Sequence, residues 1–342
     1  MKKVKINSRK NEIQLPPQKP YAGYVNSIRL FFEKEVANVK TSAKSSIWRQ
    51  NRTAYLFLLP WLLGFFCLTL GPMLGSLYLS FTKYNLLNAP VWNGLDNYKT
   101  IFTDDQSFVN SIVLTFKYVL MAVPLRLAFA LAVAMALNKG LKLLGVYRTV
   151  YYVPSLLGGS VAIAIVWRKM FDGDGLVNLF LSIFGIKGPS WIAHPSYVIY
   201  AIVALAVWQF GSAMVIFLAG LKQIPADLYE AAEVDGAGKT RQFFRITLPL
   251  LSPVIFFNLL MTIINSFQVF TPGYVIGDGR GGPIDSTLFY TLYLYLKGFS
   301  YFDMGYASAL AWILLAIIGL FTAIVFVTSK YWVFYGDGKE GH

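Results

Sequence analysis

Two glycine-rich segments contain residue types that proteins use to bind phosphate groups. Gly238-Lys239-Thr240 has the ending of a P-loop, but that signature also requires a glycine five positions before Gly238, where Glu233 stands. Residues 277–282 satisfy the pattern Gly-x-Gly-x-x-Gly, yet they lack the flanking strand and helix of a dinucleotide site. Neither segment therefore predicts nucleotide binding by this chain.

Catalytic and metal-binding chemistry is also poorly supported. Cys67 is the only cysteine, and the two histidines, His194 and His342, lie far apart in the sequence. A metal site needs ligands at short, regular spacing, so we predict no metal. An enzyme needs clustered acid, base or nucleophile side chains, and the sequence contains no such cluster. We therefore predict that this chain is not an enzyme.

The polar segment 223–249 is the most informative part of the chain. Pro225 and Asp227 are typical of a helix start, and Asp235-Gly236 is typical of a helix end. A second short helix then leads into Leu248-Pro249, where a long apolar run begins. A short helix with exposed carboxylates at a membrane surface needs an aqueous protein partner, so the segment predicts a docking site.

The elements that position this segment are membrane spans. The chain has 342 residues, of which 56% are hydrophobic and only 14% charged, and its mean hydropathy is +0.53. A soluble domain carries about a quarter charged residues. Six apolar runs lack Asp and Glu completely, and each is long enough to cross a bilayer: 54–81, 110–138, 149–171, 194–220, 249–270 and 305–328. We predict an all-α membrane protein with six transmembrane helices.

The distribution of positive charge predicts the orientation of these spans. The net charge is +13, and the two termini and alternate loops hold 21 Lys and Arg residues against 7 in the other loops. Positively charged loops stay in the cytoplasm, so we expect both termini and the polar segment there. The excess charge thus reports topology and does not predict a nucleic-acid partner.

Three regions follow along the chain. Residues 1–53 form a basic cytoplasmic extension, in which apolar residues spaced by three and four predict an amphipathic helix at about 24–48. That helix either lies on the membrane lipid or packs on the membrane domain. Residues 54–330 form the transmembrane domain, and residues 331–342 form a cytoplasmic tail.

Polar side chains inside the spans are candidates for lining a solute pathway. The fifth span carries four on an arc of about 120°, and the fourth span carries an indole beside an amide, a pairing suited to a sugar. These residues are Asn258, Thr262, Asn265 and Gln268, then Trp208 and Gln209. The alternative is that they bond neighbouring helices or a partner subunit.

Arg126 is a charged residue deep in the second span, close to Pro124. No span of this chain carries an acidic residue to pair with it. One interpretation is a counter-charge for an anionic solute such as a uronate-containing oligosaccharide. The other is pairing with backbone carbonyls or with a carboxylate from a partner subunit.

The polar segment closely resembles the EAA loop of bacterial ABC importer permeases. Glu230-Ala231-Ala232 is followed by Gly236 four residues later, then by Ile246 and Leu248-Pro249 at the spacing of that loop. Within this family the chain resembles the carbohydrate-uptake branch of the MalF, LacF and UgpA type, on three short motifs. These motifs are 94–98, 218–221 with 224–225, and 281–283 with Thr287.

The resemblance covers about residues 54–330 and implies the type I importer (MetI-like) permease fold. It also implies that Glu230, Ala231, Ala232, Asp235 and Gly236 couple the spans to an ATPase. The implied partners are a second permease in a heterodimer, a dimeric cytoplasmic ABC ATPase and an extracytoplasmic solute-binding protein. ATP and Mg²⁺ would be bound by the ATPase, so this chain itself would need no cofactor.

A second class of function is an ion-coupled secondary transporter or channel. Proton coupling normally needs carboxylates or histidines inside the membrane, and the interiors of the six predicted spans hold none. An inverted repeat would also be expected, and none is evident. We therefore expect a permease subunit of an ATP-driven sugar importer in the bacterial cell membrane.

Overall fold

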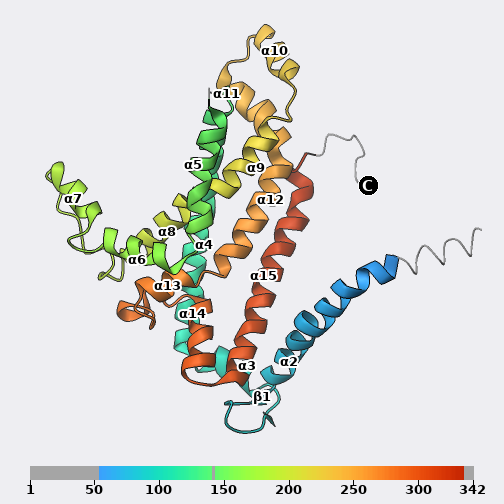
Figure 1. Ribbon diagram of the computed structural model, residues 1–342, viewed down its shortest axis with the longest axis vertical. Coiled ribbons are helices and arrows are strands. Elements are labelled where there is room, and N and C mark those ends of the chain that lie inside the picture. The colour runs from blue at the N-terminus through green and yellow to red at the C-terminus, as the bar shows by residue number, and fades with distance from the viewer. Residues whose placement is uncertain (1–53, 141–142, 335–342) are drawn as a thin grey trace, which may run out of the picture. The chain divides into compact units, whose positions relative to one another are not determined.

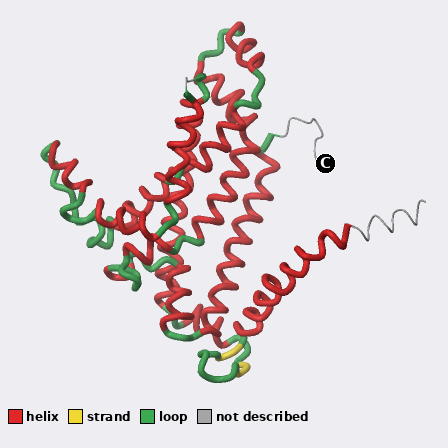
Figure 2. The backbone as a smooth tube through the Cα atoms, viewed as in Figure 1, coloured by secondary structure: helices red, strands yellow, loops and turns green. Residues whose placement is uncertain are grey.

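The computed structural model describes residues 54–140 and 143–334. The amphipathic helix expected at 24–48 and most of the expected tail lie outside these ranges. Helices account for nearly all regular structure in the described residues, as Figure 2 shows. The chain divides into two units, residues 1–73 and 74–342, and each is described by itself.

The described part of the first unit belongs to the first expected span. A continuous helical stretch runs over Ala54–Ser80 and so extends into the second unit. It includes a π-helical turn, η1 (Phe65–Leu70), and none of its most apolar window is buried. Such a helix needs lipid or another protein around its apolar surface.

The second unit contains the remaining elements. Those before the polar segment are α2 (Gly71–Ser80, which begins in the first unit), β1 (Thr82–Lys83), β2 (Val91–Trp92), α3 (Asp96–Thr103), α4 (Gln106–Leu137), α5 (Leu144–Leu157), α6 (Val161–Met170), α7 (Leu176–Ile183), α8 (Val198–Trp208) and α9 (Gly211–Leu221). Those that follow are α10 (Ala226–Val234), α11 (Lys239–Gln242), η2 (Phe243–Thr247), α12 (Leu248–Phe267), α13 (Thr271–Ile276), η3 (Pro283–Asp285), α14 (Tyr290–Tyr295), η4 (Leu296–Ser300) and α15 (Met304–Trp332). The two strands pair antiparallel, with Thr82 opposite Trp92.

The expected spans take two forms in the described residues. Four are long helical stretches apolar enough to cross a membrane, the third of which has a short break at residues 268–270: Ala54–Ser80, Gln106–Leu137, Lys239–Ile276 and Met304–Trp332. The other two are helix pairs, and six spans result when each pair counts as one. The sequence therefore located all six apolar segments.

The third and fourth spans are broken, whereas the apolar runs predicted continuous helices. The α5–α6 pair bends by 97°, and the α8–α9 pair bends by 43°. Gly158 and Gly159 lie at the first break, and Gly211 follows the second. Glycine weakens a helix by about 1 kcal/mol relative to alanine, which favours a bend at these positions. Hydropathy does not include this preference, so it did not reveal where these spans bend.

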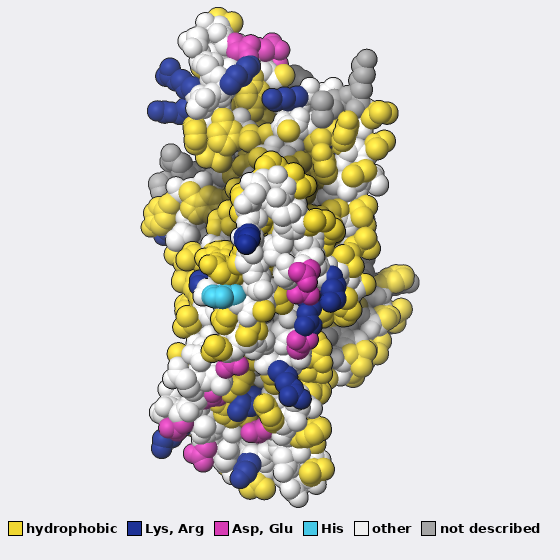
Figure 3. Space-filling view, turned by 90° about the vertical axis from the view of Figure 1, so that its left-hand side faces the viewer, with side chains coloured by type: hydrophobic (Ala, Val, Ile, Leu, Met, Phe, Trp, Pro, Cys, Tyr) yellow, Lys and Arg dark blue, Asp and Glu magenta, His cyan; other side chains and the backbone are white. Residues whose placement is uncertain are grey.

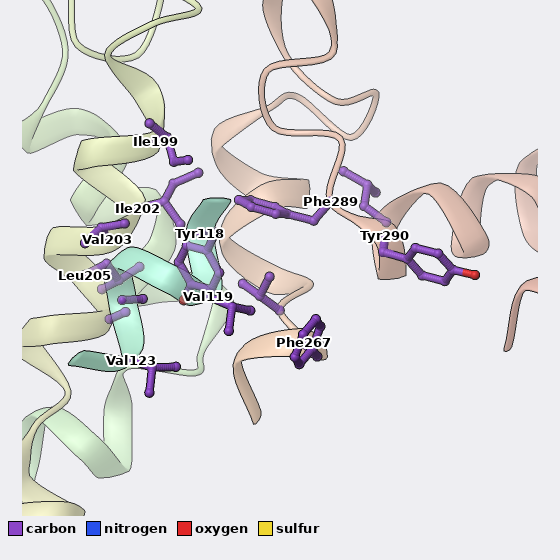
Figure 4. Close-up of a cluster of buried hydrophobic side chains, with 14 of the residues drawn as sticks. Tyr118, Val119, Val123, Ile199, Ile202, Val203, Leu205, Phe267, Phe289 and Tyr290 are labelled. Atoms are coloured by element: carbon purple, nitrogen blue, oxygen red, sulfur yellow. The ribbon is translucent and has the colours of Figure 1, made fainter. Parts of the chain in front are cut away.

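The core of the second unit lies where α4 packs against α8, α9 and α12. Figure 1 shows α4, α12 and α15 running between the end that carries α10 and the end that carries α3, with α9 in the part nearer α10. Figure 4 shows side chains of α4 and α8 beside aromatic rings from the end of α12 and the start of α14: Tyr118, Val119, Val123, Ile199, Ile202, Val203, Leu205, Phe267, Phe289 and Tyr290. This packing holds the broken spans against the continuous ones.

Candidate coupling site and solute pathway

The polar segment folds into two short helices joined by a turn. Helix α10 follows Pro225 and ends at Val234, with Asp227 in its first turn and Asp235 as its C-cap. Gly236 adopts a left-handed φ of +76°, and its N–H donates to the Glu233 carbonyl at 3.0 Å. The N–H of Ala237 donates to the Ala232 carbonyl at 2.8 Å. These two bonds form a Schellman motif, which fixes the direction of the chain after α10.

Two side-chain contacts support this turn. Lys239 forms an ion pair with Glu233, and the ammonium group lowers the pKa of that carboxyl. The buried Gln242 donates its Nε2–H to the Ala237 carbonyl at 3.0 Å. The turn is thus held from both sides, so α10 can move with α11 as one piece.

Helix α10 presents a surface that the described chain leaves uncovered. None of its residues is buried, and Val234 is 89% exposed. Tyr229 reaches the other way, where its hydroxyl and the Thr247 Oγ1 lie 2.9 Å apart. Figure 3 shows acidic and basic side chains together at the end of the molecule that carries α10. An exposed apolar residue beside charged ones suits a protein partner.

The structure brings the five predicted coupling residues together on this surface. Glu230, Ala231, Asp235 and Gly236 are exposed, and Ala232 is half-buried. Their proposed role in contacting an ATPase stays a prediction.

The four polar residues of the fifth span do not share one open surface. Asn258 and Thr262 are buried, and Asn258 Nδ2 donates to the Ala213 carbonyl of α9 at 3.4 Å. Asn265 and Gln268 are exposed. The arc expected from helical geometry is divided because α9 covers only part of α12. In this conformation only the latter two are available to a solute.

Trp208 and Gln209 lie at the break between α8 and α9, and both are half-buried. The Trp208 ring packs 5.6 Å from the ring of Trp167. Gln209 donates its Nε2–H to the Gly158 carbonyl at 3.1 Å. This amide hydrogen is therefore used within the chain, as the alternative interpretation anticipated, while contact with a solute stays a prediction for both residues.

Arg126 lies in the middle of α4 and is partly buried. Its Nε is buried without a hydrogen-bond partner among the described residues. No backbone carbonyl of the described residues accepts from this Nε, so an anionic solute and a carboxylate from a partner subunit both stay open as its partner.

Asp105 joins three helices at the end opposite α10, and the sequence analysis did not single it out. It caps α4 by accepting the Phe108 N–H at 3.0 Å, and its other oxygen accepts the hydroxyls of Tyr293 and Tyr306. The Lys297 ammonium lies 4.8 Å from the Tyr306 ring centroid. An N-cap is visible in the sequence, but its tyrosine partners are far along the chain and were not predictable.

This cluster predicts a pH-dependent stability. Burial raises the pKa of Asp105, but hydrogen bonds from Tyr293 and Tyr306 outweigh it, so the pKa lies below its ordinary value of 3.8. The Asp105 carboxyl therefore binds a proton more tightly in the unfolded chain than in the folded one. The ionised carboxylate stabilises the folded state fully above pH 3.8, and this stabilisation is lost as the pH falls toward the folded pKa. We expect the thermal midpoint of the purified protein to fall in that range.

The variant Asp105→Asn should show a lower midpoint at neutral pH and a weaker dependence on acid. Asp104→Asn is the matched control, because that exposed carboxylate accepts a side-chain bond only from Thr103 among the described residues. Equal acid dependence in wild type and Asp105→Asn would contradict the assignment.

The chain has apolar spans, two of which are broken, and an uncovered helix α10 between the fourth span and the fifth. These features together define a multi-pass membrane permease. Residues 103–332 match the family described as binding-protein-dependent transport system inner membrane component, and the chain belongs to this family. It is therefore a translocation subunit that works with a substrate-binding protein and an ABC ATPase. Membership in this family excludes the alternative function, an ion-coupled secondary transporter or channel.

Relatives and a solved structure agree with this assignment. The chain is 52% identical over 296 residues to the probable ABC transporter permease protein YesP of Bacillus subtilis (strain 168), covering 86% of this chain and 96% of that protein. It is 32% identical to the arabinooligosaccharides transport system permease protein AraP of the same organism, covering 82% and 91%. The fold matches a chain in the crystal structure of a bacterial alginate ABC transporter, with a TM-score of 0.71, 20% identity, and 82% and 95% coverage.

Proposed function

We propose that this chain forms one half of the translocation pathway of an oligosaccharide importer. The relative AraP is named for arabinooligosaccharides, and the structural neighbour belongs to a transporter crystallised with an alginate pentasaccharide-bound periplasmic protein. The other half is a second, different permease. ATP and Mg²⁺ are bound by a cytoplasmic ATPase dimer, so this chain itself binds no cofactor.

The observation that carries the proposal is the uncovered helix α10. Its five coupling residues, Glu230, Ala231, Ala232, Asp235 and Gly236, dock into the ATPase, which moves α10 when it closes on ATP. Helix α9 ends only four residues before α10 begins, so this movement reaches the spans directly. A closing ATPase thereby switches the pathway between outward and inward openings.

The orientation of the chain in the membrane follows from the charge count and from α10. Both termini and α10 are cytoplasmic, whereas the Asp105 cluster faces the extracytoplasmic solute-binding protein. The span Ala54–Ser80, which buries none of its apolar window, lies against lipid or the second permease.

The direct test is uptake by cells that carry or lack this chain. Labelled arabino-oligosaccharides and malto-oligosaccharides serve as neutral probes, and oligogalacturonates serve as acidic ones. We expect at least one of these probes to require the chain, and uptake of that probe must stop when the partner ATPase is inactivated. Uptake that continues without the ATPase would overturn the proposal.

The variant Glu230→Lys should abolish this uptake while the chain stays in the membrane. Reversing an exposed charge at the docking surface opposes its partner and costs several kcal/mol where like charges meet. The measurement is co-purification of the ATPase with the tagged permease. Asp285→Lys is the control, since that exposed carboxylate lies in η3, far from α10 in the chain. Normal ATPase association in Glu230→Lys would refute the docking role.

A further inference from the structure

The two broken spans touch each other at their breaks. Helix α5 packs against α9, and no space separates their backbones at Gly211. A Cβ atom at Gly211 would lie 2.2 Å from the Tyr151 carbonyl oxygen of α5. A Cβ atom at Gly158 would lie 2.2 Å from the Gln209 side chain. Each break is thus fitted to the other, and we call residues 155–158 with 209–212 the break junction.

The Ser155 hydroxyl satisfies two backbone groups that the second break leaves without helical partners. Its Oγ–H donates to the Gln209 carbonyl at 2.9 Å, and its oxygen accepts the Ser212 N–H at 2.9 Å. Unpaired backbone groups within a membrane cost several kcal/mol each, and serine side chains commonly pair with such groups. One side chain of α5 therefore replaces the helical bonds missing between α8 and α9.

A second bond closes the junction in the opposite direction. Gln209, at the end of α8, donates its Nε2–H to the Gly158 carbonyl at 3.1 Å. Gly158 lies directly after α5, at the start of the 97° bend into α6. The side chain from one break is thus bonded to the backbone of the other, so the spans cannot bend independently at these points.

Each side of the junction leads to another part of the molecule. Helix α9 leads through four residues into α10. Helix α6 carries Arg168, which forms an ion pair with Asp278 and donates to the Val275 carbonyl at 3.3 Å. Both Arg168 and Asp278 line a hollow of about 700 Å³ between α6 and the chain that follows α13.

We propose that Ser155 is a positioning residue of the transport cycle. Its hydroxyl locks the break of the α8–α9 span to α5, so that a displacement of α10 passes through α9 to α6 and to the hollow that α6 lines. This inference rests on the proposed coupling role of α10. Coupling through a network requires that its elements move together, and the break junction is the contact that makes them do so.

The test measures distances between spin labels in the complete transporter, made cysteine-free by Cys67→Ser and matching changes in its partners. One label pair, at Lys222 and Leu120, follows the α9 end that leads to α10 relative to α4. The second pair, at Val166 and Leu120, follows α6 relative to the same reference; all three sites are exposed. In the wild type we expect both distances to change between the nucleotide-free state and the state trapped with ATP and vanadate.

In Ser155→Ala the first distance should still change, whereas the second should lose most of its change. Ser155→Thr keeps a hydroxyl and should restore the second distance change. Thr149→Val is the matched control, because among the described residues Thr149 Oγ1 of the same helix donates only to its own helix, at the Gly145 carbonyl. Should Ser155→Ala not assemble, Gln209→Met decides, since it keeps the size of the side chain and removes the Nε2–H donor of the other bond in the break junction.

The outcomes separate the two levels of the proposal. A full change of the second distance in Ser155→Ala, or in Gln209→Met, would overturn the role of the break junction while leaving α10 as the coupling helix. Loss of both distance changes in Ser155→Ala would also overturn it, because the residue would then act on assembly. If the distance between Lys222 and Leu120 does not change with nucleotide in the wild type, the proposed function itself is overturned.

Discussion

Replacing Gly236 with valine is expected to lower solute uptake at least about tenfold while the chain remains in the membrane. Gly236 has a φ of +76°, where an L-residue costs about 1–2 kcal/mol and a β-branched one more. A cost of about 1.4 kcal/mol corresponds to a tenfold shift in an equilibrium. The open space around Gly236 accepts the new methyl groups, so the strain falls on the backbone alone.

The consequence is a redirected chain after α10. The Schellman bonds at Gly236 and Ala237 would be lost, and the docking surface would no longer hold its angle to α11. Gly238→Val is a close control, since Gly238 also has open space around it but an ordinary φ of −65°. Uptake and ATPase co-purification should be near wild type in that control. Equal losses in the two variants would show that the left-handed turn is not the cause.

Replacing Gly211 with alanine is expected to prevent stable assembly of the permease. A methyl group there would lie 2.2 Å from the Tyr151 carbonyl oxygen and 2.8 Å from the Tyr152 Cα, both backbone atoms that cannot rotate away. Over-packing costs about 1–3 kcal/mol where side chains can adjust, so we expect at least that here. The measurement is the melting midpoint of the chain in detergent, together with its amount in the membrane.

Gly319→Ala in α15 provides the opposite expectation. No atom lies within 4 Å of a Cβ at Gly319, and its φ is ordinary. Alanine favours a helix by about 1 kcal/mol over glycine, so this variant should melt at or above the wild-type temperature. A Gly211→Ala protein as stable as Gly319→Ala would show that α5 and α9 are not in the close contact described.

The position of each span could be predicted because a run of about 20 apolar residues without carboxylates has few alternatives to crossing a bilayer. The course of the third and fourth spans could not. Gly158 and Gly211 are ordinary small residues in an apolar run, and glycine is common in transmembrane helices. At their breaks, Ser155 and Gln209 supply bonds to backbone carbonyls that the bent helices leave without helical partners.

The fifth span shows a different limit. Helical geometry correctly placed Asn258 and Asn265 on nearby sides of α12, because seven residues make almost two turns. It could not show that α9 covers Asn258 and leaves Asn265 exposed. The exposure of a residue depends on which helix packs against it at that point along α12. The spacing of residues within one helix does not show which neighbour that is.

The amino-acid sequence by itself determined the membrane segments, the polar helix pair between the fourth and fifth of them and the turn at Gly236, because each follows from local composition and backbone preference. Only the tertiary structure decided the contacts between distant residues. Ser155 meets Gln209 across 54 positions, and Asp105 meets Tyr306 across 201. Hydrogen bonds of this kind depend on how helices pack around one another, and packing is a property of the whole assembled bundle.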